Sequence, residues 1–521
     1  MTVAYGFLTV LTIAMRRQAK KGKALSSNAG PAASELSSAA GDANQAAGAQ
    51  QGRFKLLSLP DGPLHHILEL CSRRGRLSLM ATCKRLKALG DGSATLWADL
   101  EVQMADDTPG LEHRFNDLCV WLAASRKRVT CLRLLADVQL GDMHPEEAEA
   151  GAYAMYDDAI ALSMVVRATL AGSCLETLVL QWPGKLEVAG WVAAMPRLRR
   201  LCLYPYHEAA HQELRFTRHL GALRCLEQLA FEADKVAMAP DCLPPSLTML
   251  CMAYMNLDDA LPEAIVQATQ LRSLGLRDIH ADLSSLALLT NLTRLELCSV
   301  NTLYRASDQH GFGVPLCALT ALRELDIDGE LGEGTLAVSR GGLVSVSHLT
   351  HLAFSIMHPS QNAAFCAAIG QLTGLRVLDL RYSSQSLVLQ RSTLAPLRHL
   401  EAAVLPLCTA AGGGVAAALA ALPSLQRLGL DGSRFLADPN EARSMAGMLA
   451  EVLGQLAASQ QLKAVCLDGR AAEFVSRQPE LFEAVRGQLA ERGIVIDKQD
   501  GWRNALKLPR SDAELRELLM A

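Results

Sequence analysis

One segment carries side chains whose types and spacing suit metal chemistry. His207, Glu208 and His211 have the H-E-x-x-H spacing, which on a helix lets two imidazoles share a zinc ion beside a glutamate general base. That chemistry also needs a third ligand and an open cleft. The segment begins two residues after Pro205, in an expected connection between strands, and Glu227 downstream lies between two further strands. The sequence therefore disfavours zinc, and we expect no metal and no cofactor.

Other patterns that could support chemistry are equally weak. The glycine run Gly412 to Gly414 lacks the lysine and Ser/Thr of a phosphate-binding loop. The sequon Asn291-Leu292-Thr293 falls inside an expected strand. The 14 cysteines include no C-x-x-C pair, and we interpret them as reduced thiols that pack as small hydrophobes in an intracellular protein. We therefore predict no catalytic residues and no enzyme activity.

Charge and the N-terminus also limit the choice of partner. The net charge is -4, from 50 basic and 54 acidic residues, so no global field attracts nucleic acid or an anionic membrane. The apolar run 3–15 is shorter than the about 20 residues that span a bilayer, so we expect no stable membrane insertion. Its basic residues follow it, which is the reverse of a secretory signal. Two interpretations of the N-terminus stay open, an organelle transit peptide and a flexible tail. We expect residues 1–53 to be disordered.

One pattern, L-x-x-L-x-L, recurs through most of the chain, usually at intervals of 21 to 30 residues. Its second half suits a short strand whose alternate side chains point inward. A helix does not fit, because the last leucine would lie on the wrong face. One unit alone would expose its apolar edge, whereas stacked units bury a continuous aliphatic core. The copies begin at Val129, Leu175, Leu198, Leu226, Leu247, Leu271, Leu292, Leu322, Leu349, Leu375, Leu400, Leu425 and Leu462.

These units resemble the leucine-rich-repeat family. The resemblance implies an α/β solenoid with a curved parallel sheet and a helical or irregular convex side, which we place at residues 129–470. The chain departs from the fullest family pattern because it lacks the asparagine ladder that follows the last leucine of each unit. The long interval from Leu430 to Leu462 predicts a helical insertion, as does the segment 152–170.

The residues after the repeats, 471–521, are predicted to form a C-terminal helical cap. Apolar spacing predicts helices near 480–492 and 512–520, with a short strand at 494–496 between them.

A helical segment precedes the repeats at residues 54–100. The apolar residues Leu64, Ile67, Leu68 and Cys71 of this segment have the i, i+3, i+4, i+7 spacing of one helix face. Between this segment and the repeats, we expect a helical linker or cap at 101–128. The order of motifs in the segment resembles an F-box, a small three-helix domain. The resemblance rests on Leu59-Pro60-Asp61, Cys83-Lys84-Arg85-Leu86 and Leu96-Trp97, whereas Gly62-Pro63 replaces the acidic residue common in the family.

In that family the F-box docks onto the Skp adaptor of a cullin-RING ubiquitin ligase, and the repeats that follow hold a protein substrate. The resemblance implies that this chain is a substrate-recognition subunit of such a ligase, working in the cytoplasm or nucleus. Two alternatives stay open: a helical cap on the first repeat and a ligase-independent interaction scaffold. The resemblance implies that the residues that bind the adaptor are Leu59, Pro60, Leu64, Ile67, Leu68 and Leu86.

Substrate contacts are predicted from strand alternation, because residues between the inward leucines point to the concave side of the sheet. An acidic centre beside aromatic residues would suit a basic peptide or protein surface, although a solvated sheet face needs no partner at all. The predicted positions are Trp182, Tyr204, Tyr254, Arg294, Glu296, Glu324, Asp326, Asp328, Asp379 and Arg381.

Overall fold

A computed structural model describes the chain in segments. The described residues are 60–70, 80, 84–92, 98–105, 122, 129–137, 172–182, 185–188, 190–205, 213–253, 256–298, 316–328, 342–354, 362–381, 387–412, 414–432 and 439–498. Within them, two helices precede the first strand: α2 (Asp61–Leu70) and α4 (Lys84–Gly92).

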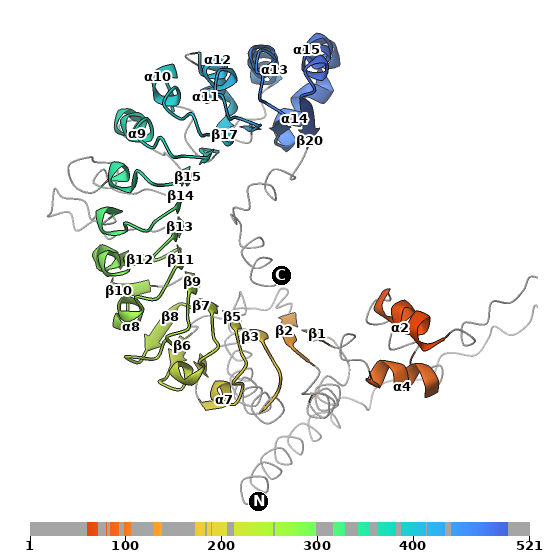
Figure 1. The fold of residues 1–521 in the computed structure, drawn as a ribbon, viewed down its shortest axis with the longest axis vertical. Coiled ribbons are helices and arrows are strands. Elements are labelled where there is room, and N and C mark those ends of the chain that lie inside the picture. Colours follow the sequence, from red (N-terminus) through yellow and green to blue (C-terminus); the bar gives the residue numbers. More distant parts are fainter. Residues whose placement is uncertain are drawn as a thin grey trace, which may run out of the picture. The chain divides into compact units, whose positions relative to one another are not determined.

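Fifteen of the described strands form one parallel sheet, which we call the main sheet. Figure 1 shows its strands stacked in chain order, as expected when each repeat adds one strand beside the last. The predicted α/β leucine-rich-repeat solenoid with a curved parallel sheet is therefore confirmed. The strands are β1 (Asp99–Ala105), β2 (Cys131–Asp137), β3 (Thr177–Trp182), β5 (Arg200–Pro205), β7 (Gln228–Glu232), β9 (Met249–Ala253), β11 (Ser273–Arg277), β13 (Arg294–Cys298), β14 (Glu324–Asp328), β15 (His351–Phe354), β16 (Val377–Asp379), β17 (Ala402–Pro406), β18 (Arg427–Asp431), β19 (Ala464–Leu467) and β20 (Val495–Lys498).

A backbone ladder joins successive repeats at the start of each strand. The carbonyl of Thr293 accepts hydrogen bonds from two consecutive amides of the next repeat, Arg323 N at 2.8 Å and Glu324 N at 2.9 Å. Threonine hydroxyls reinforce the ladder at several steps, as where Thr350 Oγ1 donates to Arg323 O at 3.1 Å. These bonds hold the repeats in register although the family's asparagine ladder is missing.

The register places the repeat leucines opposite one another across strands. Leu274 of β11 pairs with Leu250 of β9 on one side and with Leu295 of β13 on the other. All three side chains have no exposed surface, and they belong to one hydrophobic core that extends from Leu100 to Ile494. Burial of this aliphatic core is the main stabilising term of the solenoid.

The side of the main sheet that carries this core changes character along the chain. Early repeats place short strands there: β4 (Lys185–Val188), β6 (Glu213–Phe216) and β8 (Lys235–Met238) form one sheet, and β10 (Asn256–Ala260) and β12 (His280–Asp282) form another. Short helical turns also connect the strands: α7 (Gly190–Ala193), η3 (Leu220–Ala222), α8 (Glu263–Gln267), η4 (Ser284–Leu288), η5 (Leu316–Ala318) and η8 (Leu343–Val346). Later repeats place α-helices on this side, as Figure 1 shows: α9 (Asn362–Ile369), α10 (Arg391–Leu394), α11 (Leu407–Ala411), α12 (Val415–Ala420), α13 (Pro439–Leu456), α14 (Gly469–Arg477) and α15 (Pro479–Glu491).

Paired phenylalanines join the two layers in both halves. Phe231 of β7 packs on Phe216 of β6 with ring centroids 4.8 Å apart, and Phe354 of β15 packs on Phe365 of α9 at 5.0 Å. The same aromatic contact therefore supports a strand layer early in the chain and a helix layer later.

The main sheet is longer than the leucine pattern predicts. Strand β1 pairs with β2, so the first strand begins at Asp99 rather than at Val129, and the segment after residue 101 starts as a strand instead of a helical linker. It was missed because Leu100, Val102 and Met104 alternate without a preceding repeat leucine.

At the other end, β20 pairs with β19, so the main sheet continues beyond residue 470. Helix α13 confirms the predicted insertion before Leu462, and α15 and β20 confirm the predicted helix and strand near 480–496. The predicted N-terminal tail, the segment 152–170 and the helix near 512–520 lie outside the described residues.

Leu274→Ala should lower the free energy of unfolding by about 2 to 5 kcal/mol, because it leaves a cavity in a close-packed core. Leu288→Ala is a matched control, since Leu288 is 58% exposed and Leu274 is fully buried; it should change stability by less than about 0.5 kcal/mol. Urea unfolding followed by circular dichroism compares the two. Equal losses would contradict the assigned register.

Candidate functional site

The strand residues that alternate with the core leucines form the other side of the main sheet, which we call the concave face. Its central row places Gly275, Glu296 and Asp326 opposite one another on β11, β13 and β14. Neighbouring parallel strands lie about 4.8 Å apart, so side chains in such a row contact their neighbours directly. The predicted residues of β13 and β14 are therefore brought together.

Two arginines and two glutamates form an ion-pair network in the middle of this face. Arg294 lies 3.5 Å from Glu296 through one guanidinium nitrogen and 3.5 Å from Glu324 through another, so it joins β13 to β14. Arg277 of β11 approaches Glu296 from the other side at 3.9 Å. Because the side chains of Arg277 and Glu296 are each only 9% exposed, the arginines compensate a carboxylate that is largely removed from water.

Two more carboxylates follow on β14. Asp326 and Asp328 are half-buried on the same face, and the Cys298 thiol donates a weak hydrogen bond to Asp328 at 3.9 Å. Burial, together with the nearby carboxylates, raises the pKa of Cys298 to about 12, so it stays a neutral thiol. The four carboxylates of this cluster outnumber its two guanidinium groups, so the centre of the face is acidic.

Asp379 and Arg381, which strand alternation predicts to contact a substrate, are buried in this chain. Their side chains are 0% and 3% exposed. Arg381 donates to both carboxylate oxygens of Asp379, with a closest distance of 2.6 Å, and its backbone amide donates to the same carboxylate at 3.1 Å. The pair organises the turn after β16, and a partner could not reach it without a conformational change.

Tyr204 is also buried, with only 6% of its surface exposed, and its substrate contact stays a prediction. It lies in an apolar cluster on the concave face with Val179, Cys202, Ala230 and Cys251. Burial raises the pKa of the Cys202 thiol to about 12. The predicted aromatic positions Trp182 and Tyr254 have side chains outside the described part of the chain.

The helices before the main sheet hold the residues predicted to bind an adaptor. Leu64 and Leu68, one helical turn apart on α2, have no exposed surface, and Leu86 of α4 is 2% exposed. Pro60 is exposed, and its carbonyl accepts the amide of Leu64 at 3.3 Å to start α2. These leucines are buried within this chain, and their role in adaptor docking stays a prediction. Leu59 and the side chain of Ile67 lie outside the described residues.

The H-E-x-x-H pattern of a zinc site, His207 to His211, lies outside the described residues. Within the described residues, no group of His, Cys, Asp and Glu could hold a metal ion. The side chain of Asn291, the sequon residue, donates to Thr269 O of the preceding repeat at 2.9 Å. No described helix is long and apolar enough to cross a membrane.

Comparison with known proteins decides the identity of the N-terminal helices. The family model described as "F-box domain" matches residues 56–94, which include both α2 and α4. This chain contains an F-box domain, followed by leucine-rich repeats. F-box and leucine-rich-repeat domains are typically non-enzymatic adaptor and interaction domains, which suggests a substrate receptor or an interaction scaffold.

The other comparisons add less. A solved structure of a leucine-rich-repeat protein from Leptospira interrogans is similar, with 16% sequence identity, a TM-score of 0.41, and coverage of 79% of this chain and 98% of that chain. No curated protein matches in sequence. The strand order and the backbone ladder of this chain are those of a leucine-rich-repeat solenoid.

Asp379→Asn should lower the free energy of unfolding by about 3 to 5 kcal/mol, because it leaves the buried guanidinium of Arg381 without its charge partner. Glu401→Gln removes the same charge from the Arg376–Glu401 pair, whose side chains are 60% and 49% exposed, and should cost at most about 1 kcal/mol. Urea midpoints at neutral pH test the difference. A similar cost for both would contradict the burial of the first pair.

Proposed function

We propose that this F-box protein is the substrate-recognition subunit of a Skp-cullin-F-box ubiquitin ligase. The observation that carries the proposal is the F-box match at residues 56–94, followed in the chain by a leucine-rich-repeat solenoid. F-box domains generally bind the Skp adaptor of cullin-RING ligases. In this role the chain has no catalytic residues, because ubiquitin transfer takes place on partner subunits. Such ligases work in the cytoplasm and nucleus, which is where we place the protein.

Exposed positions on the two F-box helices are the better candidates for adaptor contact. Pro60 and Asp61 are exposed at the start of α2, and Lys84 and Ala88 are exposed on α4. Partner contact needs surface that the chain itself does not cover, which Leu64 lacks. We therefore assign adaptor docking to these exposed positions and a supporting role to the buried leucines.

A ligase-independent scaffold is the second candidate function. Burial of the predicted docking leucines favours it, because helices with a closed apolar face can serve simply as an N-terminal cap of the solenoid. In that case the repeats alone would bind a partner protein, and the chain would not bind the Skp adaptor.

On the repeat side, we propose that the substrate presents a basic segment to the acidic centre of the concave face. Arg294 pairs with Glu296 and Glu324, and Asp326 and Asp328 add two further carboxylates on β14. Both retain some exposure, so lysine or arginine side chains of a partner could approach them. Complementary charge of this kind favours the correct partner and speeds association.

The adaptor test is a pull-down of purified Skp adaptor by the full chain. The wild type should retain the adaptor, and Pro60→Glu combined with Ala88→Arg should abolish retention, because both changes alter exposed surface rather than the core. Ala364→Arg, at an exposed position of α9, is the control and should bind normally. Failure of the wild type to bind would overturn the ligase role in favour of the scaffold. Normal binding by the double variant would overturn only the assigned docking surface.

The substrate surface can be tested with a fluorescent Lys-Ala-Lys-Ala-Lys peptide, read by anisotropy. Asp326→Asn with Asp328→Asn should weaken its binding about tenfold, and added salt should reduce that difference. Glu480→Gln with Glu483→Gln removes the same charge from exposed positions of α15 and should have little effect. Equal weakening by both pairs would mean that overall charge, rather than the concave face, attracts the peptide.

A further inference from the structure

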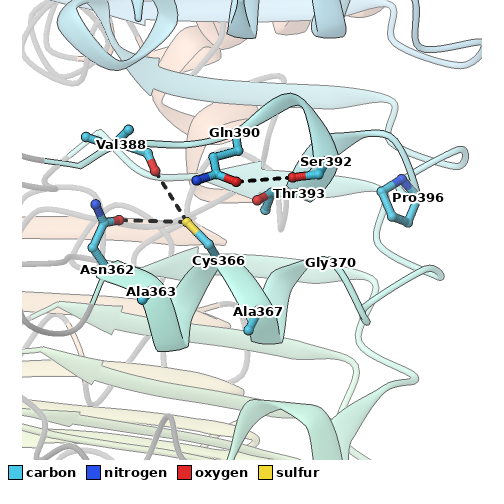
Figure 2. Close-up of a pocket in the computed structure, with 10 residues that line it drawn as sticks. All are labelled: Asn362, Ala363, Cys366, Ala367, Gly370, Val388, Gln390, Ser392, Thr393 and Pro396. Carbon is cyan, nitrogen blue, oxygen red and sulfur yellow. Dashed lines mark hydrogen bonds between the residues drawn. The ribbon is translucent and has the colours of Figure 1, made fainter. Parts of the chain in front are cut away.

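A cavity of about 580 Å³ lies on the helical side of the solenoid, between α9 and the segment that leads into α10. Figure 2 shows Asn362 and Cys366 on one wall, and Val388, Gln390 and Ser392 across from them. The two walls belong to successive repeats. Binding sites for small ligands have volumes of about 300 to 1,000 Å³, so the cavity is large enough to hold a ligand. We call it the α9–α10 groove.

The wall formed by α9 is lined by small side chains. Ala363, Ala367 and Gly370 follow at intervals of four and three residues, which places them on one face of the helix. Both alanines are exposed, and a Cβ atom at Gly370 would come no closer than 3.5 Å to its neighbours. A bound chain could therefore approach the backbone of α9 closely.

The opposite wall provides polar groups in a defined arrangement. Ser392 Oγ donates to Gln390 Oε1 at 3.3 Å, which orients the amide and leaves its nitrogen as a hydrogen-bond donor for the groove. Thr393 beside it is only 6% exposed. None of the ten described residues that line the groove is charged. A charged ligand would gain no ionic partner from these residues, so the groove favours an uncharged one.

Val388 gives the groove an exposed apolar edge. Among the described residues, large hydrophobic side chains are exposed at Leu288, Val388, Leu481 and Val495, and of these Val388 alone lines the cavity. It is 58% exposed. Covering this side chain would remove apolar surface from water, which stabilises a complex.

Cys366 joins the two walls and does not act as a nucleophile. Its thiol donates to Val388 O at 3.5 Å and contacts Asn362 Oδ1 at 3.8 Å (Figure 2). Burial raises the pKa of this thiol above its ordinary value, which keeps it neutral. The groove is thus suited to binding rather than to covalent chemistry.

We propose that the α9–α10 groove binds an uncharged, extended peptide segment of a partner protein. A small aliphatic side chain of the segment packs against Val388, Ala363 and Ala367, and a main-chain carbonyl accepts a hydrogen bond from Gln390 Nε2. This site is separate from the concave face and from the F-box, so the solenoid can hold a second protein while its substrate is bound. The inference does not depend on the ligase role.

The probes are three blocked, fluorescein-labelled peptides, acetyl-Ala-Val-Ala, acetyl-Ala-Lys-Ala and acetyl-Ala-Glu-Ala, each added to the full chain. Anisotropy should detect binding of the valine peptide at least tenfold more tightly than the charged ones. The unlabelled valine peptide should also slow alkylation of Cys366 by a maleimide, followed by mass spectrometry, without slowing alkylation of the exposed Cys317. Absence of binding, equal binding of all three peptides, or no protection of Cys366 would overturn the proposal.

Two matched pairs of variants locate the site. Ala367→Arg fills the groove and should weaken binding of the valine peptide at least tenfold, whereas Ala364→Arg places the same side chain at an exposed position of α9 that does not line it. Val388→Ser should weaken binding, whereas Leu288→Ser, at a residue also 58% exposed, should not. Thermal melting checks that all four variants fold. Unchanged binding by Ala367→Arg would place the peptide elsewhere and overturn the assignment.

Discussion

The inter-repeat backbone ladder is the interaction on which the rest of the structure depends. One carbonyl before each strand receives two amides of the next repeat, as Arg376 O does from Glu401 and Ala402 at 2.7 and 3.0 Å. A shift of one residue would turn every leucine from the core to the concave face, so the ladder and the hydrophobic core enforce the same register. At the start of the strands, backbone groups and threonine hydroxyls provide the bonds between repeats, although the family's asparagine ladder is absent from the sequence.

That register also determines how charge is arranged on the concave face. Glu296 lies between Arg277 and Arg294 because their strands are neighbours, although the three residues are separated in sequence. Asp379 finds its partner two residues away and becomes fully buried. Carboxylates that look alike in the sequence therefore have different environments: Asp379 is fully buried, whereas Asp326 and Asp328 keep part of their surface exposed. Burial, rather than strand position, separates the two classes.

The helical side of the solenoid is less constrained, because each connection needs only to cover the leucine core. Strands, short helical turns and α-helices all occur there. The α9–α10 groove lies on this side, between the connections of two consecutive repeats.

The sequence by itself determined the class of the protein. Leucine spacing predicted the strands from Leu175 to Leu467, the Leu-Pro and Cys-Lys-Arg-Leu motifs predicted the F-box, and the long interval before Leu462 predicted α13. These signals are local, since each depends on periodicity within a few residues. Only the tertiary structure decided that Tyr204 and Arg381 are buried, that β1 and β20 extend the main sheet, and that uncharged residues around Cys366 form a groove. Burial and cavities arise from what neighbouring repeats cover, and alternation along one strand carries no information about its neighbours' side chains.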